Sequence, residues 1–115
     1  MTKKNIVFFG FLLFSLWVNS AYGETTATLA GRVTDAQGAA VSNATVEAIN
    51  TATNNTLTAT TNEDGRYVFT ELQPGNYRLS VRQTGFQTSV KENVALNVAS
   101  RATQDFALQV GEVSA

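Results

Sequence analysis

The chain has no cysteine and no histidine, and it has one proline in 115 residues. Without cysteine an exported domain has no disulfides, so packing alone must stabilise it. The two absences also exclude thiol nucleophiles, histidine-based catalysis and nitrogen or sulfur metal sites. The serines have no base partner, and no carboxylates are paired by pattern. The sequence therefore predicts a protein that is not an enzyme, with no catalytic residues, no cofactor and no metal site.

One acidic segment, Asn62-Glu63-Asp64, could offer oxygen ligands to calcium. The ligand series of a calcium loop is missing, however. Asp64 also precedes Gly65, and this pair is typical of a tight turn. We interpret the segment as a solvated hairpin turn.

The N-terminal residues have the order of a secretory signal. Lys3 and Lys4 precede an apolar run of 13 residues, 6–18, and the small residues Ala21 and Gly23 follow. A membrane-spanning helix needs roughly 17–25 residues. We predict a signal peptide over residues 1–23, cleaved after Gly23, in preference to a retained anchor. The protein is then exported, to the periplasm or outer membrane of a bacterium or, alternatively, into the medium.

The residues after 23 carry little net charge. Six basic and nine acidic residues give a net charge of −3. No basic patch indicates binding to nucleic acid, so we expect no nucleic-acid partner.

Apolar residues alternate with polar ones along most of the remaining chain, which predicts strands with one buried face. Seven short strands at about ten-residue spacing predict an all-β, seven-stranded antiparallel β-sandwich. The expected divisions are a flexible lead over 24–26, the sandwich over 27–110 and a tail or linker over 111–115. The strands are expected at 27–34, at 44–50, at Leu57/Ala59/Thr61, at Tyr67/Phe69, at Tyr77/Leu79/Val81, at Val94/Leu96/Val98 and, after a turn at 99–101, at Phe106/Leu108/Val110.

The core is predicted from the same alternation. Tyr67, Phe69, Tyr77 and Phe86 could also form a platform for a sugar. The period-2 spacing of the first three favours packing, whereas Phe86 after Gly85 is expected to be partly exposed. Pro74-Gly75 predicts a type II turn. We expect a monomer with these residues in its core: Val46, Tyr67, Phe69, Leu72, Tyr77, Leu79 and Val81.

Several short motifs occur in order at natural spacing. They are Gly31-Arg32-Val33-Thr34-Asp35, Asn43-Ala44-Thr45-Val46, the segment 62–67 (NEDGRY) and the segment 72–77 (LQPGNY). Together they resemble the carboxypeptidase-regulatory-like family, which has a transthyretin-like (prealbumin-like) sandwich and is grouped with carbohydrate-binding-like folds. The resemblance covers nearly all of 27–110. Asn43 stands where many relatives have glycine, and asparagine also tolerates a turn.

The resemblance implies a binding role and names no ligand or binding residue. The family includes N-terminal extensions of TonB-dependent outer-membrane receptors, so the expected partner is a protein, such as the plug and barrel of a longer chain. The alternative is a freestanding secreted or periplasmic module that binds carbohydrate or protein. Related adhesin domains carry a lysine–asparagine crosslink, but here Lys91 is the only lysine after the signal and Arg32 occupies the first-strand position. A partner strand could pair with residues 106–110 if they form a sheet edge.

Overall fold

The structure is a computed structural model, and it describes residues 25–111. The predicted signal peptide and most of the predicted tail lie outside these residues. Within them the regular structure is all β, and no helix could span a membrane. The prediction of an all-β sandwich is confirmed.

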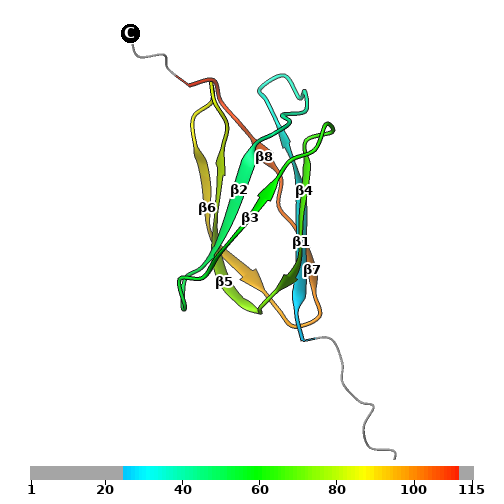
Figure 1. Cartoon of the computed structure of the whole chain (residues 1–115), viewed down its shortest axis with the longest axis vertical. Helices are drawn as coiled ribbons and strands as arrows, with labels where there is room; N and C mark the ends of the chain where they lie inside the picture. Colours follow the sequence, from blue (N-terminus) through cyan, green and yellow to red (C-terminus); the bar gives the residue numbers. More distant parts are fainter. Residues whose placement is uncertain (1–24, 112–115) are drawn as a thin grey trace, which may run out of the picture.

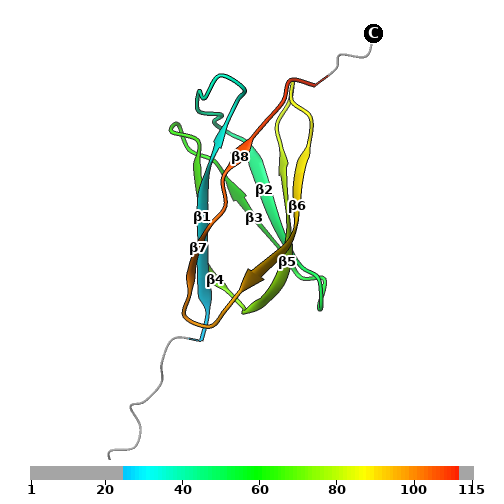
Figure 2. The ribbon, with the colours of Figure 1, turned by 180° about the vertical axis from the view of Figure 1, so that it is seen from behind.

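Eight strands form two facing sheets, which are seen from opposite sides in Figures 1 and 2. The β1 sheet has the order β4-β1-β7, with β8 also paired to β1, and the β2 sheet has the order β3-β2-β5-β6. Their bounds are β1 Ala27–Thr34, β2 Thr45–Asn50, β3 Thr56–Thr60, β4 Arg66–Leu72, β5 Gly75–Arg82, β6 Ser89–Leu96, β7 Arg101–Thr103 and β8 Phe106–Ala107.

The apolar faces of the two sheets meet in one core. All seven predicted core residues are buried, and Leu29, Val33 and Leu108 are fully buried with them. The alternation in the sequence produces this core because successive side chains of a strand point to opposite faces. Phe86 is half-buried, as predicted, and packs against the core.

The C-terminal third differs from the predicted strand pattern. Strand β6 begins at Ser89, earlier than the apolar residues indicated, and Val98 lies beyond it, 60% exposed. The expected last strand is two short strands, β7 and β8, interrupted at Gln104-Asp105. Both run parallel to β1, whereas the other pairings are antiparallel. The mostly polar sequence of β6 hid its start, because Leu96 at its end is the one buried residue of the strand.

The connection from β4 to β5 also differs from its prediction. Gly75 has φ 152°, far from the value of about +80° that a type II turn requires, and it is the first residue of β5. This connection crosses from one sheet to the other, so the chain need not reverse as a hairpin does. The hydroxyl of Tyr77 donates to the carbonyl of Gln73 at 2.7 Å and ties the crossing together. The arrangement resembles the tyrosine corner of other sandwiches.

Two positions in the resemblance motifs have clear backbone roles. Asn43 has φ 60°, the left-handed conformation that asparagine tolerates better than most residues. Gly31 on β1 faces the backbone of Gln104, where a Cβ would overlap the carbonyl oxygen. Glycine is therefore required there by the close approach of a segment far away in the sequence.

Candidate functional site

The predicted turn at residues 62–65 is a hydrogen-bonded loop. The side-chain oxygen of Asn62 accepts from the N–H groups of Asp64 at 2.9 Å and Arg66 at 3.0 Å. Gly65 has φ 75°, as the Asp-Gly pair predicts. In the described residues no three of Asp, Glu, His or Cys gather in a way that could hold a metal ion. The loop therefore serves to reverse the chain, and its asparagine oxygen is already occupied.

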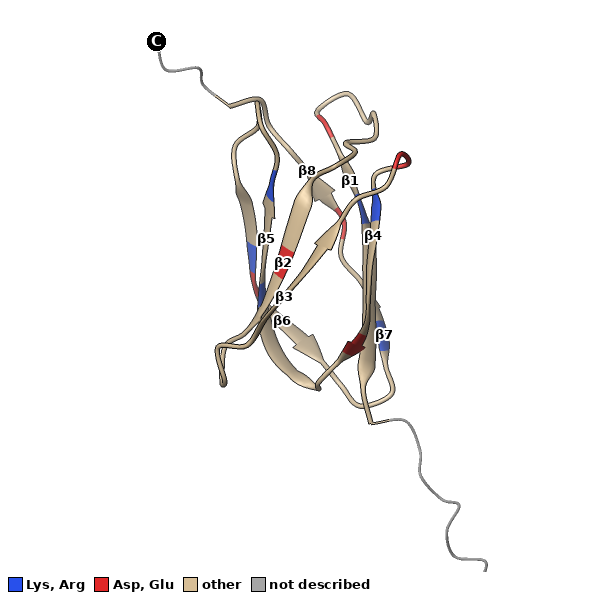
Figure 3. Ribbon diagram, viewed as in Figure 1, with Lys and Arg blue, Asp and Glu red and all other residues tan. Residues whose placement is uncertain are grey.

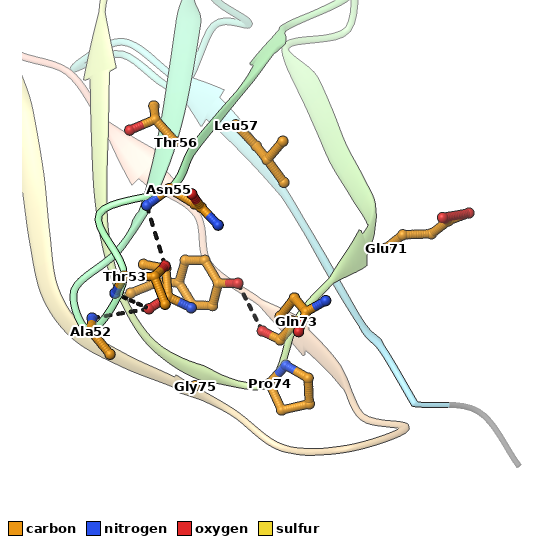
Figure 4. Close-up of a pocket in the computed structure, with 11 residues that line it drawn as sticks. Ala52, Thr53, Asn55, Thr56, Leu57, Glu71, Gln73, Pro74 and Gly75 are labelled. Carbon is orange, nitrogen blue, oxygen red and sulfur yellow. Dashed lines mark hydrogen bonds between the residues drawn. The ribbon is translucent and has the colours of Figure 1, made fainter.

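A hollow of about 550 Å³ lies where the β2–β3 hairpin meets the β4–β5 crossing. Figure 4 shows the side chains that line it. Two of them build the loops: Asn50 accepts from the N–H groups of Ala52 and Thr53, and the hydroxyl of Tyr77 is bonded to Gln73. We call this feature the hairpin hollow. Its lining residues are Asn50, Ala52, Thr53, Asn55, Thr56, Leu57, Glu71, Gln73, Pro74, Gly75 and Tyr77.

Other groups in the hairpin hollow are free to meet a ligand. Among residues 25–111 the side chains of Asn55, Thr56 and Gln73 make no hydrogen bond, and Leu57 is 47% exposed. The one charged group, the carboxylate of Glu71, is turned away from the other side chains (Figure 4). The hollow thus offers amides, a hydroxyl and apolar surface. This chemistry suits a neutral polar ligand better than an ion.

A second hollow, of about 590 Å³, lies on the outer side of the β1 sheet. Arg32 on β1 lies directly opposite Arg66 on β4, and both line it. The Arg32 guanidinium donates to the carbonyl of Asp64 at 3.1 Å, and its backbone N–H donates to Asp105 at 2.9 Å. Charges elsewhere are dispersed over the molecule (Figure 3). The described residues thus show no extended basic patch.

The aromatic side chains belong to the core. Tyr67 is 3% exposed, Phe69 6% and Tyr77 3%, so the predicted packing is confirmed. The hydroxyl of Tyr67 donates to the carbonyl of Gln104 and fixes the segment between β7 and β8. Burial, and after it the nearby charge of Asp105, raises the pKa of Tyr67 above its ordinary value of 10.0. Tyr67 is thus a neutral structural donor.

The C-terminal segment is an edge, but much of it is already covered. Phe106 and Leu108 are buried, the carbonyl of Gln109 accepts from Gln87 at 2.8 Å, and the N–H of Gly111 donates to Gly85 at 2.9 Å. These bonds join residues 109–111 to the loop after β5. Residues 106–110 are therefore a poor acceptor for a partner strand, and the packing interpretation is favoured.

Comparison with known proteins places the chain in a family. Residues 28–109 match the carboxypeptidase regulatory-like domain, and the chain belongs to that family. The search among curated proteins finds no match. The resemblance inferred from the sequence motifs is therefore confirmed.

Several solved structures share the fold at low identity. The Bacillus anthracis TIE protein is 19% identical with a TM-score of 0.64, over 75% of this chain and 17% of that one. The minor pilin GBS52 of Streptococcus agalactiae is 13% identical with a TM-score of 0.62, over 80% and 48%. A putative carbohydrate binding protein from Bacteroides uniformis is 15% identical with a TM-score of 0.60, over 75% and 42%. The chain thus spans less than half the length of each.

These likenesses define the fold and leave the activity open. A 3-chlorocatechol 1,2-dioxygenase from Rhodococcus opacus shares the fold as well, at 12% identity and a TM-score of 0.60. Function in such folds depends on the residues of the site. The sequence of this chain has no histidine or cysteine, and the hairpin hollow holds one carboxylate at its rim.

Proposed function

We propose that the domain is a non-catalytic protein-interaction module of an exported protein, the N-terminal extension of a TonB-dependent outer-membrane receptor that acts in the periplasm. Family membership and the predicted signal peptide before the domain support this. The observation that carries the proposal is the position of the chain ends. Strand β1 begins at one end of the sandwich and residue 111 lies at the opposite end (Figure 1). The domain can therefore connect an exported N-terminal segment at one end to a following domain at the other end.

The gene itself offers a direct test of the receptor context. The reading frame beyond the codon for Ala115 should continue into a plug and into strands of about 9–11 residues, the length that crosses an outer membrane. A stop codon at that place would contradict the receptor and leave the freestanding module.

Export can be tested on the chain as it is. N-terminal sequencing of the protein recovered from a periplasmic extract should begin at Glu24, because the apolar run is short and Ala21 and Gly23 form the cleavage site. Material that keeps Met1 and stays with the membrane would contradict the prediction.

The alternative, a carbohydrate-binding module, is favoured by the lining of the hairpin hollow, in which every residue but Glu71 is uncharged. Titration calorimetry against a panel of neutral oligosaccharides should then show binding that Gln73→Ala and Asn55→Ala both weaken. Gln37→Ala, in the turn after β1, serves as the control because Gln37 does not line the hollow. Absence of binding across the panel, or equal loss in the control, would count against this alternative.

A further inference from the structure

The two sheets end in four edges, and an exposed edge can pair with another strand unless something blocks it. The β2 sheet ends in β3 and β6, and the β1 sheet ends in β4 and in the β7–β8 segment. Proteins protect such edges with charges, bulges, prolines or covering segments. The four edges of this domain differ in this respect.

Three edges are protected. On β6 the pairing register shifts beside Asn93, which has φ 59°, and Lys91 and Glu92 add charges. On β4 the register shifts opposite the start of β1, and the strand carries Arg66 and Glu71. The β7–β8 edge is interrupted, and the residues after it bond to the loop after β5. Each of these features disturbs the straight row of backbone groups that a partner strand needs.

Strand β3 has none of these protections. Its sequence, Thr-Leu-Thr-Ala-Thr, has no charge and no proline, and it pairs with β2 in unbroken register over all five residues. The N–H of Thr61 donates to the carbonyl of Ala44, and the N–H of Asn50 donates to the carbonyl of Asn55. The two pairs that flank this ladder are therefore hydrogen-bonded pairs. Because these pairs alternate along an antiparallel ladder, Leu57 and Ala59 bond to β2. The N–H and C=O groups of Thr56, Thr58 and Thr60 consequently point outward from the sheet.

Strand β3 fits against a second copy of itself that runs in the opposite direction. An antiparallel copy centred on Thr58 places Thr58 opposite Thr58, and Thr56 opposite Thr60. All six outward backbone groups of each strand then find partners. On the other face Leu57, which is 47% exposed, lies beside Ala59 of the second copy, so a large side chain meets a small one. Facing threonines are favourable cross-strand neighbours.

We propose that β3 is a self-association edge, at which two copies of this chain pair antiparallel about Thr58 and join their β2 sheets into one. The proposal goes beyond the proposed function and does not depend on it. It also replaces the monomer expected from the sequence.

The charges near this edge lie outside β3 itself. Arg66 begins β4 next to Glu63 and Asp64 of the preceding turn, and Glu71 lies near the end of β4 (Figure 3). Because β3 carries no charge, the pairing brings no like charges opposite each other along the two strands. A five-residue edge is smaller than a standard protein interface. The dimer is accordingly weak and concentration-dependent.

Because the chain lacks cysteine, single cysteines can report the pairing register. Directly opposed residues of a hydrogen-bonded pair have Cα atoms about 5.5 Å apart, within disulfide range. Thr58→Cys in the exported, purified protein should therefore form disulfide-linked dimers on mild oxidation. Thr56→Cys and Thr60→Cys should each crosslink poorly alone, because equal positions lie about 14 Å apart along the strands, and well when mixed. Val90→Cys, exposed on β6, is the control.

Sedimentation at rising protein concentration gives a second measurement. Thr58→Lys places like charges opposite each other and should abolish the dimer, whereas Thr58→Val keeps the backbone and should preserve it. Thr58 is exposed, so both variants should melt like the parent. The proposal is overturned if Thr58→Cys crosslinks no better than Val90→Cys, if Thr56→Cys crosslinks alone as well as in the mixture, or if the parent stays monomeric at every concentration.

Discussion

Gly31 must be glycine because a segment that is distant in the sequence lies against its backbone. It lies on β1, where an added Cβ would overlap the carbonyl oxygen of Gln104 and come within 2.8 Å of Cε2 of Tyr67. Both neighbours are held in place, since the hydroxyl of Tyr67 donates to that carbonyl and Gln104 donates to Ala30 at 2.9 Å. Neither can move without loss of a hydrogen bond.

Gly31→Ala should therefore destabilise the domain by about 1–3 kcal/mol through overpacking. It should also change the near-ultraviolet circular dichroism of the aromatic residues, because Tyr67 must shift. Gly38→Ala is the control: Gly38 has φ 87° but no heavy atom within 4 Å of an added Cβ. That variant should be strained yet keep the near-ultraviolet spectrum. An unchanged spectrum and unchanged stability in Gly31→Ala would contradict the close approach.

Tyr67 should make stability depend on pH in the alkaline range. Its pKa is raised in the folded state, so unfolded chains lose the proton first. The stabilisation is complete below about pH 10, the ordinary pKa of tyrosine, and falls as pH rises above it. Urea unfolding of the parent should show this fall in stability between about pH 8 and pH 11, a range that spans the ordinary pKa of tyrosine.

Tyr67→Phe tests the same group. It should lose about 1–3 kcal/mol at neutral pH, because the carbonyl of Gln104 is left without its donor. It should also lose part of the alkaline pH dependence. The same alkaline slope in Tyr67→Phe as in the parent would show that other groups cause it.

At the scale of the strands, the alternating pattern predicted the elements that have one buried face. The bounds of β1 agree with the predicted 27–34, and the inward residues of β4 and β5 were identified correctly. The pattern was wrong for β6 and for the β7–β8 segment. Strands β6 and β7 bury few side chains, so pairing with a neighbour and not burial decides their conformation.

The buried hydroxyl of Thr61 joins two elements. It accepts from the N–H of Ala44 at 2.8 Å and donates to the carbonyl of Val41 at 2.8 Å, and Thr61 is 3% exposed. The hydroxyl thereby anchors the loop before β2 to the residue after β3. The sequence pattern included Thr61 in the expected third strand but could not show this role.

Thr61→Val should cost about 1–3 kcal/mol, because it leaves two buried backbone groups without partners. Thr61→Ser keeps the hydroxyl and should cost clearly less. Chemical denaturation of the two variants measures the difference, and equal losses would show that the methyl group matters instead.

At the scale of the whole molecule, the core joins the two sheets into one unit. Leu79 on β5 is fully buried and Phe69 on β4 is 6% exposed, so each sheet contributes a large side chain. A domain of this size with no disulfides has few other sources of stability. The sandwich should therefore unfold cooperatively.

Leu79→Ala and Phe69→Ala should each cost about 2–5 kcal/mol, enough to unfold much of a small domain. Val68→Ala is the control beside Phe69, since Val68 is 52% exposed and its change should stay within about 0.5 kcal/mol. Far-ultraviolet dichroism and urea unfolding report the result. A Leu79→Ala variant as stable as the parent would contradict the shared core.

The candidate site could be predicted only in part. The turn residues of its loops, Thr51 to Asn55 and Pro74-Gly75, were recognisable as breaks between strands. That these loops meet was not recognisable, because the hairpin hollow joins the β2–β3 hairpin to the β4–β5 crossing, two segments about twenty residues apart in the sequence. The half-exposed Leu57 likewise reads as an ordinary inward residue until the edge position of β3 is known.

The sequence by itself determined the all-β class, the family, the residues of the core and the tight turn at Asp64-Gly65. Each of these depends on local chemistry, such as the period of two in a strand or the tolerance of glycine for positive φ. Only the tertiary structure decided that β7 and β8 run parallel to β1, why Gly31 must be glycine, and which of the four edges is left unprotected. These features depend on which distant backbone groups meet, and side-chain periodicity carries no information about that pairing.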